Sequence, residues 1–344
     1  PSAPALADTQ AKIDSIQQKL DALINALSAL GLVWLNDVVS RTNTFAVIEF
    51  TVDWAVKFIF CTANIPTMRV SVYEVSPRDG LQNLPVFVDT EIKRRLIDNL
   101  YSAGIKKIEE TSTAHPKLVP QMADAEKVFR KGSVLVMNKK GYDRALAMGA
   151  EKINIVFSPC EEFNMKNMKK TRSEIILMYK TFMKIPKKNV RAYISMSFGS
   201  PYSGEVRENT MRSCIRDAKM FADTIVFADT VGIATPRKMK TLIKLAKEED
   251  VKIAIHLHHK GDEDKAMEIV KVALFGGVKE FDSSIGGLGG CPFSEDSGAN
   301  ISTERLVRSL HSWGFTTGVD IKKLIVAGKL ATRIKENNSN ILAV

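Results

Sequence analysis

Cysteine is scarce in this sequence, and its few occurrences are far apart. Only four of the 344 residues are cysteine, with neither a CxxC pair nor a Cys/His cluster of the zinc-finger type. Such spacing argues against a disulfide framework and indicates a reducing compartment. Glycine (20) and proline (12) are too sparse for a collagen-like or low-complexity chain. With 45% hydrophobic and 26% charged residues, the composition is that of an ordinary globular protein.

The sequence also lacks an apolar run of the kind that indicates a transmembrane helix. The most apolar stretch, residues 44–61, carries Glu49, Asp53 and Lys57 at four-residue intervals, which places a polar stripe along a helix. Its β-branched and aromatic residues permit strands as well. Neither a signal peptide nor an Arg-rich transit peptide is recognisable, and the C-terminus is not a peroxisomal address. We therefore expect no transmembrane segment.

Positive charge is unevenly distributed along the chain. The net charge is +10, yet residues 1–66 hold four basic and six acidic residues, so the excess lies in the remainder. A net positive charge on residues 67–344 is compatible with binding nucleic acid, or with binding an anionic metabolite such as a nucleotide-bearing thioester. No nucleic-acid-binding motif is present, and few aromatic residues lie among the lysines. We therefore expect no nucleic-acid partner.

The first 66 residues have a pattern of their own. Six apolar residues recur at alternating spacings of three and four, which is the a/d pattern of nearly three heptads; they are Ile13, Ile16, Leu20, Leu23, Leu27 and Leu30. One interpretation is a single amphipathic helix lying on its own domain. The other is a short coiled coil. Because the apolar side chains would be exposed on a monomer, we expect residues 1–60 to form a homo-oligomer or dock into a larger assembly.

From residue 67 to residue 344, short β-like runs alternate with helical stretches. The predicted strands span residues 69–75, 105–109, 133–137, 152–157, 190–197, 224–228, 252–256 and 280–283. Predicted helices follow most of them, over residues 90–103, 140–148, 173–183, 207–221, 236–249 and 265–275. Eight βα repeats in roughly 250 residues predict an α/β fold, a (β/α)8 TIM barrel, whose chemistry lies at the C-terminal ends of the strands.

Several motifs fall at those strand ends. They are EVSPRDGLQN (74–83), IEETS (108–112), HPKLVPQM (115–122), FADTVGIATP (227–236), IHLH (255–258) and DSSIGGLGGCPF (282–293). In this order and spacing they resemble the 3-hydroxy-3-methylglutaryl-CoA lyase family, one of the barrel metallolyases that include isopropylmalate and homocitrate synthases. The resemblance covers residues 68–331. It implies cleavage of an acyl-CoA substrate to acetoacetate and acetyl-CoA, in the mitochondrial matrix or a bacterial cytoplasm.

Four residues in this part of the chain could hold a divalent cation. Asp79, His256, His258 and Asn300 offer mixed nitrogen and oxygen ligands suited to Mg²⁺ or Mn²⁺. In a strand, His256 and His258 point to the same side, as two ligands of one metal must. The alternative interpretation of this pair is two buried, hydrogen-bonded histidines without a metal.

Three charged residues are candidate catalytic groups. Arg78 can polarise a carbonyl and stabilise enolate charge; otherwise it forms a surface ion pair. Glu109 matches the family's active-site glutamate and would organise Arg78 or a metal-bound water; otherwise it is a strand-end ion pair. Asp229 would orient a metal-binding histidine or transfer a proton, and its alternative role is a helix N-cap.

The resemblance adds a cysteine and several substrate contacts. Cys291 lies in GGLGGCPF, where the glycines allow a loop to close over substrate, and in the family this cysteine is a general acid/base. Gln82, Asn138 and Tyr202 are expected to bind substrate. The candidates for contact with the CoA phosphates are Lys139 and Lys140.

The sequence departs from the family pattern close to these residues. An acid usually follows the second metal histidine, where this chain has His259; an Ala-Asn pair reads Ala266-Met267, and Asp296 replaces a glycine. Changes beside metal ligands commonly lower metal affinity or activity by roughly ten- to hundredfold. Two other functions therefore stay open: a synthase of the same fold that condenses acetyl-CoA with a 2-oxo acid, and an inactive lyase-like scaffold protein.

Deleting residues 1–66 tests the role of the extension. We expect the mass in solution to fall while metal-dependent cleavage stays largely intact, because the extension carries none of the candidate site residues. Light scattering and a cleavage assay measure the two quantities. An unchanged mass would contradict an assembly role, and an unchanged mass with lost activity would instead indicate that the extension covers the barrel.

Overall fold

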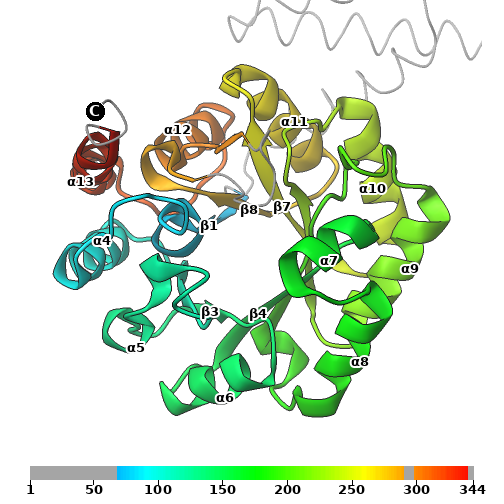
Figure 1. Ribbon diagram of the computed structural model, residues 1–344. Helices are drawn as coiled ribbons and strands as arrows, with labels where there is room; N and C mark the ends of the chain where they lie inside the picture. Colours follow the sequence, from blue (N-terminus) through cyan, green and yellow to red (C-terminus); the bar gives the residue numbers. More distant parts are fainter. Residues whose placement is uncertain (1–67, 290–297, 340–344) are drawn as a thin grey trace, which may run out of the picture. The chain divides into compact units, whose positions relative to one another are not determined.

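The computed structural model describes residues 68–289 and 298–339, which form a parallel β-barrel surrounded by helices (Figure 1). Strands β1 to β8 pair in sequence order, and parallel pairing of β1 with β8 closes the barrel. The predicted (β/α)8 TIM barrel is confirmed. The heptad pattern and residues 44–61 lie outside the described residues. Within the described ranges, no helix has the length and hydropathy needed to cross a membrane.

The strands lie close to their predicted positions. The barrel consists of β1 (Ser71–Glu74), β2 (Lys107–Ser112), β3 (Ser133–Leu135), β4 (Lys152–Phe157), β5 (Val190–Ile194), β6 (Thr224–Asp229), β7 (Lys252–His259) and β8 (Glu280–Ser283). A further strand, β9 (Ala299–Asn300), pairs antiparallel with the end of β7. This added strand was not predicted, because two residues carry no periodic pattern.

Four of the helices in the described residues were not predicted: α5 and α7, which are too short to show apolar periodicity, and α12 and α13, which follow the last predicted strand. The α-helices are α4 (Thr90–Ser102), α5 (Ala125–Val128), α6 (Lys139–Ala147), α7 (Glu161–Met168), α8 (Arg172–Phe182), α9 (Glu208–Lys219), α10 (Pro236–Glu248), α11 (Glu263–Phe275), α12 (Thr303–Ser312) and α13 (Ile321–Ser339). Side-chain caps set where some of them begin. The Asp262 side chain accepts a hydrogen bond from the Lys265 backbone, so α11 begins two residues before its predicted start.

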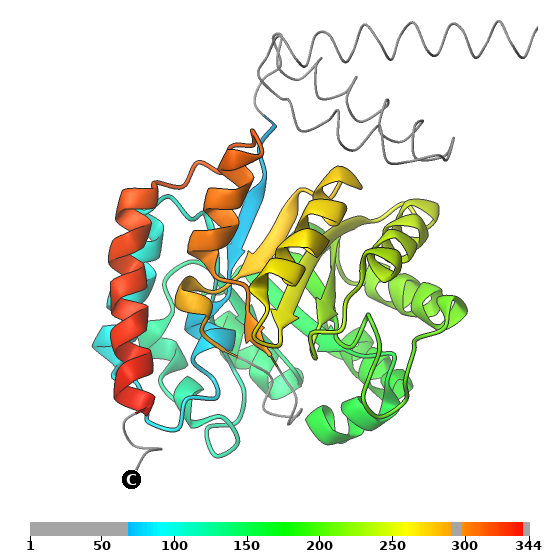
Figure 2. The ribbon, with the colours of Figure 1, turned by 90° about the horizontal axis from the view of Figure 1, so that it is seen from above.

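The C-terminal helix packs against the first helix of the barrel. Helix α13 runs alongside α4 (Figure 2), and the Asp320 N–H donates to the Ala103 carbonyl at 2.8 Å. Gly104 has a positive φ of 92°, and a Cβ there would lie only 2.5 Å from the Gly318 carbonyl oxygen. The close approach of these two connections therefore requires glycine at position 104.

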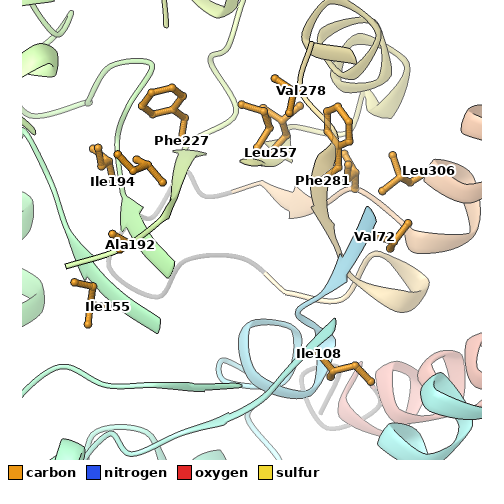
Figure 3. Packing of buried hydrophobic residues seen from close by; sticks show 14 of the residues in the cluster. Val72, Ile108, Ile155, Ala192, Ile194, Phe227, Leu257, Val278, Phe281 and Leu306 are labelled. Atoms are coloured by element: carbon orange, nitrogen blue, oxygen red, sulfur yellow. The ribbon is translucent and has the colours of Figure 1, made fainter. Parts of the chain in front are cut away.

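Alternate residues of each strand face the helices or the barrel interior. On β8, Phe281 packs in the hydrophobic layer (Figure 3), whereas Glu280 and Asp282 on either side of it contact Arg191 on β5. Because β5 and β8 are not neighbours, these contacts cross the barrel. The larger part of the apolar core thus lies between strands and helices, and the interior holds both charged groups and a smaller apolar cluster that includes Leu135, Val156 and Val226.

Glu74, at the end of β1, joins three parts of the fold. Its fully buried carboxylate accepts hydrogen bonds from the Ser76 N–H (2.9 Å), the Ile285 N–H (3.0 Å) and the Thr303 hydroxyl (2.6 Å). Burial raises the pKa of Glu74 to about 7, although these hydrogen bonds oppose the rise. The side chain therefore ties β1 to the connection after β8 and to the start of α12.

The substitution Glu74→Gln tests this linkage through its pH dependence. A carboxyl whose pKa is raised on folding, here from 4.5 to about 7, stabilises the fold below pH 4.5 and loses that contribution as the pH rises through 7. Relative to E74Q, wild type should lose about 2 kcal/mol of unfolding free energy between pH 5 and pH 8. Urea unfolding of both proteins measures this, and a pH-independent difference would contradict it.

Candidate active site

Most of the predicted site residues gather at the carboxyl ends of the barrel strands. A cavity of about 470 Å³ lies there, lined by Arg78, Asp79, Gln82, His256 and His258 among others. A larger cavity of about 700 Å³ opens at the opposite, amino-terminal ends of the strands. None of the predicted site residues lines that larger cavity, so the candidate active site is the smaller one.

The two histidines of β7 point into this cavity with their Nε2 atoms facing each other. These two atoms are 3.0 Å apart, and both rings are buried. The Nδ1 atom of His258 lies 3.1 Å from the Thr230 carbonyl oxygen, which can accept only from an Nδ1–H. In the neutral ring, that contact places the proton on Nδ1 and leaves the Nε2 lone pair of His258 available to a metal ion.

Asp79 and Asn300 complete the cluster from two other elements. Asp79 lies in a π-helical turn, η1 (Ser76–Gly80), and its Oδ2 is 3.7 Å from Nε2 of His258. Asn300 reaches the cluster because β9 pairs it with His258. Its Nδ2 donates to Asp79 Oδ2 (2.7 Å) and to the Leu288 carbonyl (2.9 Å), so binding a cation through Oδ1 requires the amide to turn over.

This donor set fits a divalent cation. One ligand atom from each of Asp79, His256 and His258 can be chosen so that all three lie within 4.8 Å of one another. Neighbouring ligands of an octahedral ion with bonds of about 2.1 Å are about 3 Å apart, which is the separation of the two Nε2 atoms. Neutral imidazole with carboxylate and amide oxygens suits Mg²⁺ or Mn²⁺.

The charge states of the cluster follow from its partners. Burial disfavours the Asp79 carboxylate, but Arg78 and the two histidines outweigh burial and hold the pKa of Asp79 well below its usual value. Burial likewise opposes a charged imidazole, whereas Asp79 raises the pKa of His258. Asp79 is therefore ionised at neutral pH, as a metal ligand must be.

Arg78 is held between two carboxylates at the edge of the cavity. Its Nε donates to Glu109 at 2.5 Å and its Nη1 to Asp79 at 2.7 Å. Burial opposes its charge, yet Glu109 and Asp79 raise the pKa of Arg78. Only 9% of its side chain is exposed, so it is not the surface ion pair that was the alternative. Gln82 donates to the same Asp79 oxygen at 2.9 Å.

Glu109 is fully buried on β2 and bridges Arg78 to the barrel interior. Its second oxygen accepts from Asn154 Nδ2 at 2.7 Å. The same Asn154 side chain exchanges hydrogen bonds with the Tyr73 hydroxyl at 2.9 and 3.2 Å. Glu109 is thus fixed on both sides and in turn fixes the guanidinium of Arg78.

Asp229 contacts a loop rather than the metal-binding histidines. Its two oxygens accept from the backbone N–H groups of Ile233 (2.9 Å) and Ala234 (2.7 Å), and burial raises its pKa. Asp229 is therefore not a helix N-cap, since the N-cap of α10 is Thr235. Its hydrogen bonds likewise go to backbone N–H groups and not to His256 or His258. Asp229 instead holds the turn after β6, whose Thr230 carbonyl contacts His258.

Of the three remaining predicted site residues, Asn138 lines the cavity and the other two are not among the described residues that line it. Asn138 lines the cavity, although its side chain also caps α6 by accepting from the Gly141 N–H at 2.8 Å. Tyr202 is not among the described residues that line the cavity, and its ring lies 4.1 Å from Lys166 Nζ. Cys291 lies outside the described residues.

The lysines proposed for the CoA phosphates lie elsewhere. Lys139 pairs with Asp143 on the exposed surface of α6, at 2.6 Å, and neither Lys139 nor Lys140 is among the described residues that line the cavity. Besides Arg78, His256 and His258, the basic residues that line the cavity come from the end of α7 and from the connection after β2; they are His115, Lys166, Lys169 and Lys170. The three lysines were not predicted as site residues because α7 itself was not predicted.

Several uncharged polar residues in the cavity were also missed. Ser112, Tyr193, Ser195 and Thr230 line it from the ends of β2, β5 and β6. Tyr193 and Ser195 fall within the predicted strand 190–197, and Ser112 and Thr230 follow the ends of the predicted strands 105–109 and 224–228 by three and two residues, so their closeness to strand ends was the available signal. The substituted neighbours His259 and Met267 do not line it: His259 pairs with Ala299 in the β7–β9 ladder, and Met267 packs in the core.

Comparison with known proteins assigns the barrel to a family. The HMGL-like family model matches residues 69–330. The mitochondrial hydroxymethylglutaryl-CoA lyase of Macaca fascicularis is 36% identical over 282 residues, which cover 78% of this chain and 86% of that protein.

Comparison with solved structures gives the same family. The HMG-CoA lyase of Bacillus subtilis aligns with a TM-score of 0.72 at 33% identity, over 80% of this chain and 96% of that one. An HMG-CoA lyase of Acinetobacter baumannii, in complex with coenzyme A and 3-methylmalate, has a TM-score of 0.70 at 30% identity, over 77% and 91% of the two chains. The barrel, its strand-end cluster and these matches together establish that the chain belongs to the HMGL-like family and is a lyase of the oxo-acid-lyase type.

Proposed function

We propose that this lyase cleaves 3-hydroxy-3-methylglutaryl-CoA to acetoacetate and acetyl-CoA with the help of a divalent metal ion. The observation that carries the proposal is the convergence of Asp79, His256 and His258 beside the buried, charged Arg78. The names of the relatives supply the substrate class. Scaffold proteins without activity have no need of three buried ligands directed at one point.

Different residues of the site have different roles in the proposed reaction. A cation held by Asp79, His256 and His258, with Asn300 after its amide turns, would supply Lewis-acid polarisation of the substrate oxygens. Arg78 donates hydrogen bonds to the thioester carbonyl oxygen and stabilises the negative charge that develops there. Glu109 keeps the guanidinium in place throughout, since the two are joined at 2.5 Å.

The bond changes balance without an external oxidant or reductant. A base in the site takes the proton of the tertiary hydroxyl, and that carbon becomes the ketone of acetoacetate as its bond to the thioester α-carbon breaks. The electron pair stays on the acetyl-CoA fragment as an enolate. We assign protonation of its α-carbon to Cys291, on the basis of the family resemblance of the loop that contains it.

The CoA phosphates are assigned to the basic end of the cavity. Lys166, Lys169 and Lys170 lie together at the end of α7 and line the cavity. Phosphates bind to such clusters through charge-assisted hydrogen bonds. This assignment replaces Lys139 and Lys140.

The compartment and the assembly are proposed from the relatives and from the N-terminal apolar pattern. Mitochondrial relatives favour the matrix, and the bacterial structures keep a bacterial cytoplasm as the alternative. Residues 1–66 stay proposed as a separate extension from the catalytic domain, 67–344, with residues 1–60 mediating self-association or docking.

Metal dependence is tested with the Asp79→Asn variant. Wild type should release acetoacetate and acetyl-CoA with Mg²⁺ or Mn²⁺ and lose this activity in EDTA, and D79N should lose more than about 100-fold in kcat/KM. Asp143→Asn, which removes a carboxylate from an exposed ion pair on α6, is the control. Folded wild type that is inactive with both metals would contradict the proposal. CoA release from acetyl-CoA only when a 2-oxo acid is added would favour the synthase.

The CoA-binding assignment is tested by charge reversal. The double variant K169E/K170E should raise KM for the substrate roughly tenfold with little change in kcat, because it removes about 1–2 kcal/mol of binding to phosphate. The matched double variant K139E/K140E should behave as wild type. The opposite result, with KM raised only in K139E/K140E, would restore the original assignment.

A further inference from the structure

Asp282, a buried carboxylate on β8, lies directly behind one of the two metal-binding histidines. Its Oδ2 is 3.4 Å from Nδ1 of His256, while Nε2 of the same ring faces His258 in the cavity. The 3.4 Å separation is longer than a hydrogen bond, and within the described part of the chain Nδ1 of His256 has no hydrogen-bond partner. Contacts of this kind are often long in unliganded sites and tighten on binding.

Two partners hold Asp282 in this position. Arg191 Nη2 donates to its Oδ1 at 2.6 Å, and the Tyr193 hydroxyl donates to its Oδ2 at 2.7 Å. The guanidinium of Arg191 lies over the Tyr73 ring, 3.5 Å from its centre. All four side chains are buried. The carboxylate can therefore neither leave the interior nor rotate freely.

Such a network is not explained by stability alone. The desolvation of a buried ion pair commonly costs as much as its attraction returns, so packed apolar residues would stabilise the barrel at least as well. A metal-binding imidazole, however, needs a fixed tautomer. A carboxylate behind Nδ1 keeps the proton there, leaves Nε2 as the lone-pair donor, and raises the basicity of the ring.

We propose that Asp282, anchored by Arg191, is a positioning residue that fixes the tautomer and orientation of His256 and so sets the metal affinity of the site. This inference rests on the proposed metal-dependent function. It also distinguishes the two histidines, because Nδ1 of His258 faces the neutral carbonyl of Thr230 instead.

The chain offers a closely matched control on the same strand. Glu280 also points inward from β8 and also pairs with Arg191, at 3.1 Å, but its other partner is Lys107 rather than a histidine. The substitutions D282N and E280Q therefore each remove one carboxylate charge from Arg191. Only the first changes what His256 faces.

The substitution Asp282→Asn has a specific expected effect on the His256 tautomer. Arg191 has only donors and will take the single amide oxygen, which turns the amide NH₂ toward Nδ1 of His256. That arrangement favours the Nε2–H tautomer, which cannot bind a metal through Nε2. We expect the dissociation constant for Mn²⁺ to rise about 10- to 100-fold in D282N and to stay within about threefold of wild type in E280Q.

The experiment measures Mn²⁺ binding to the full chain by electron paramagnetic resonance without substrate, together with ¹⁵N NMR of the imidazoles. With diamagnetic Mg²⁺ bound, wild type should show His256 protonated only at Nδ1, whereas D282N should keep a proton at Nε2. If D282N does not fold, R191K, which removes one of the two anchors of Asp282, should still weaken Mn²⁺ binding severalfold.

The outcomes separate the two proposals. Failure of wild type to bind Mn²⁺ would overturn the proposed metal site and this inference with it. Binding by wild type and equally by D282N, or equally by R191K where D282N does not fold, would overturn only the role of Asp282. An E280Q loss as large as that of D282N would also overturn it, since the effect would then come from Arg191.

Discussion

Charge buried inside a barrel must be balanced at close range, and this constraint organises the whole candidate site. Arg78 is held between Glu109 and Asp79, and Arg191 between Asp282 and Glu280. Removing one member of such a pair leaves an uncompensated charge, which costs far more than the intact pair contributes. The charged residues therefore fix one another's positions.

The barrel makes this possible because its stability comes from elsewhere. The apolar layer between strands and helices, seen around Phe281 and Phe227 in Figure 3, excludes water from the outer face of the sheet, and a smaller apolar cluster fills part of the interior. Parallel strands then bring polar residues from distant parts of the sequence to one end of the barrel.

The sequence predicted the elements and single residues better than the contacts between them. The strands were found from their apolar runs, and His256 and His258 from their spacing of two in one of those strands. The hydrogen-bond partners of Asp229 were not predicted, because an acid after a strand has several possible backbone partners, and only the fold shows that Ile233 and Ala234 are used. The link between Arg191 and Asp282 could not be predicted, because it joins β5 to β8 across the barrel. The lysines of α7 were missed because the apolar pattern of that helix is too short.

In the proposed site, Asp79, His256 and His258 bind one cation at the carboxyl end of the barrel. The most direct measurement is the anomalous scattering of Mn²⁺ in crystals of the full chain. We predict a single strong peak within about 2.0–2.3 Å of Nε2 of both histidines and of an Asp79 oxygen. No peak at that position, or a peak that none of these three side chains touches, would show that they do not form a cation site.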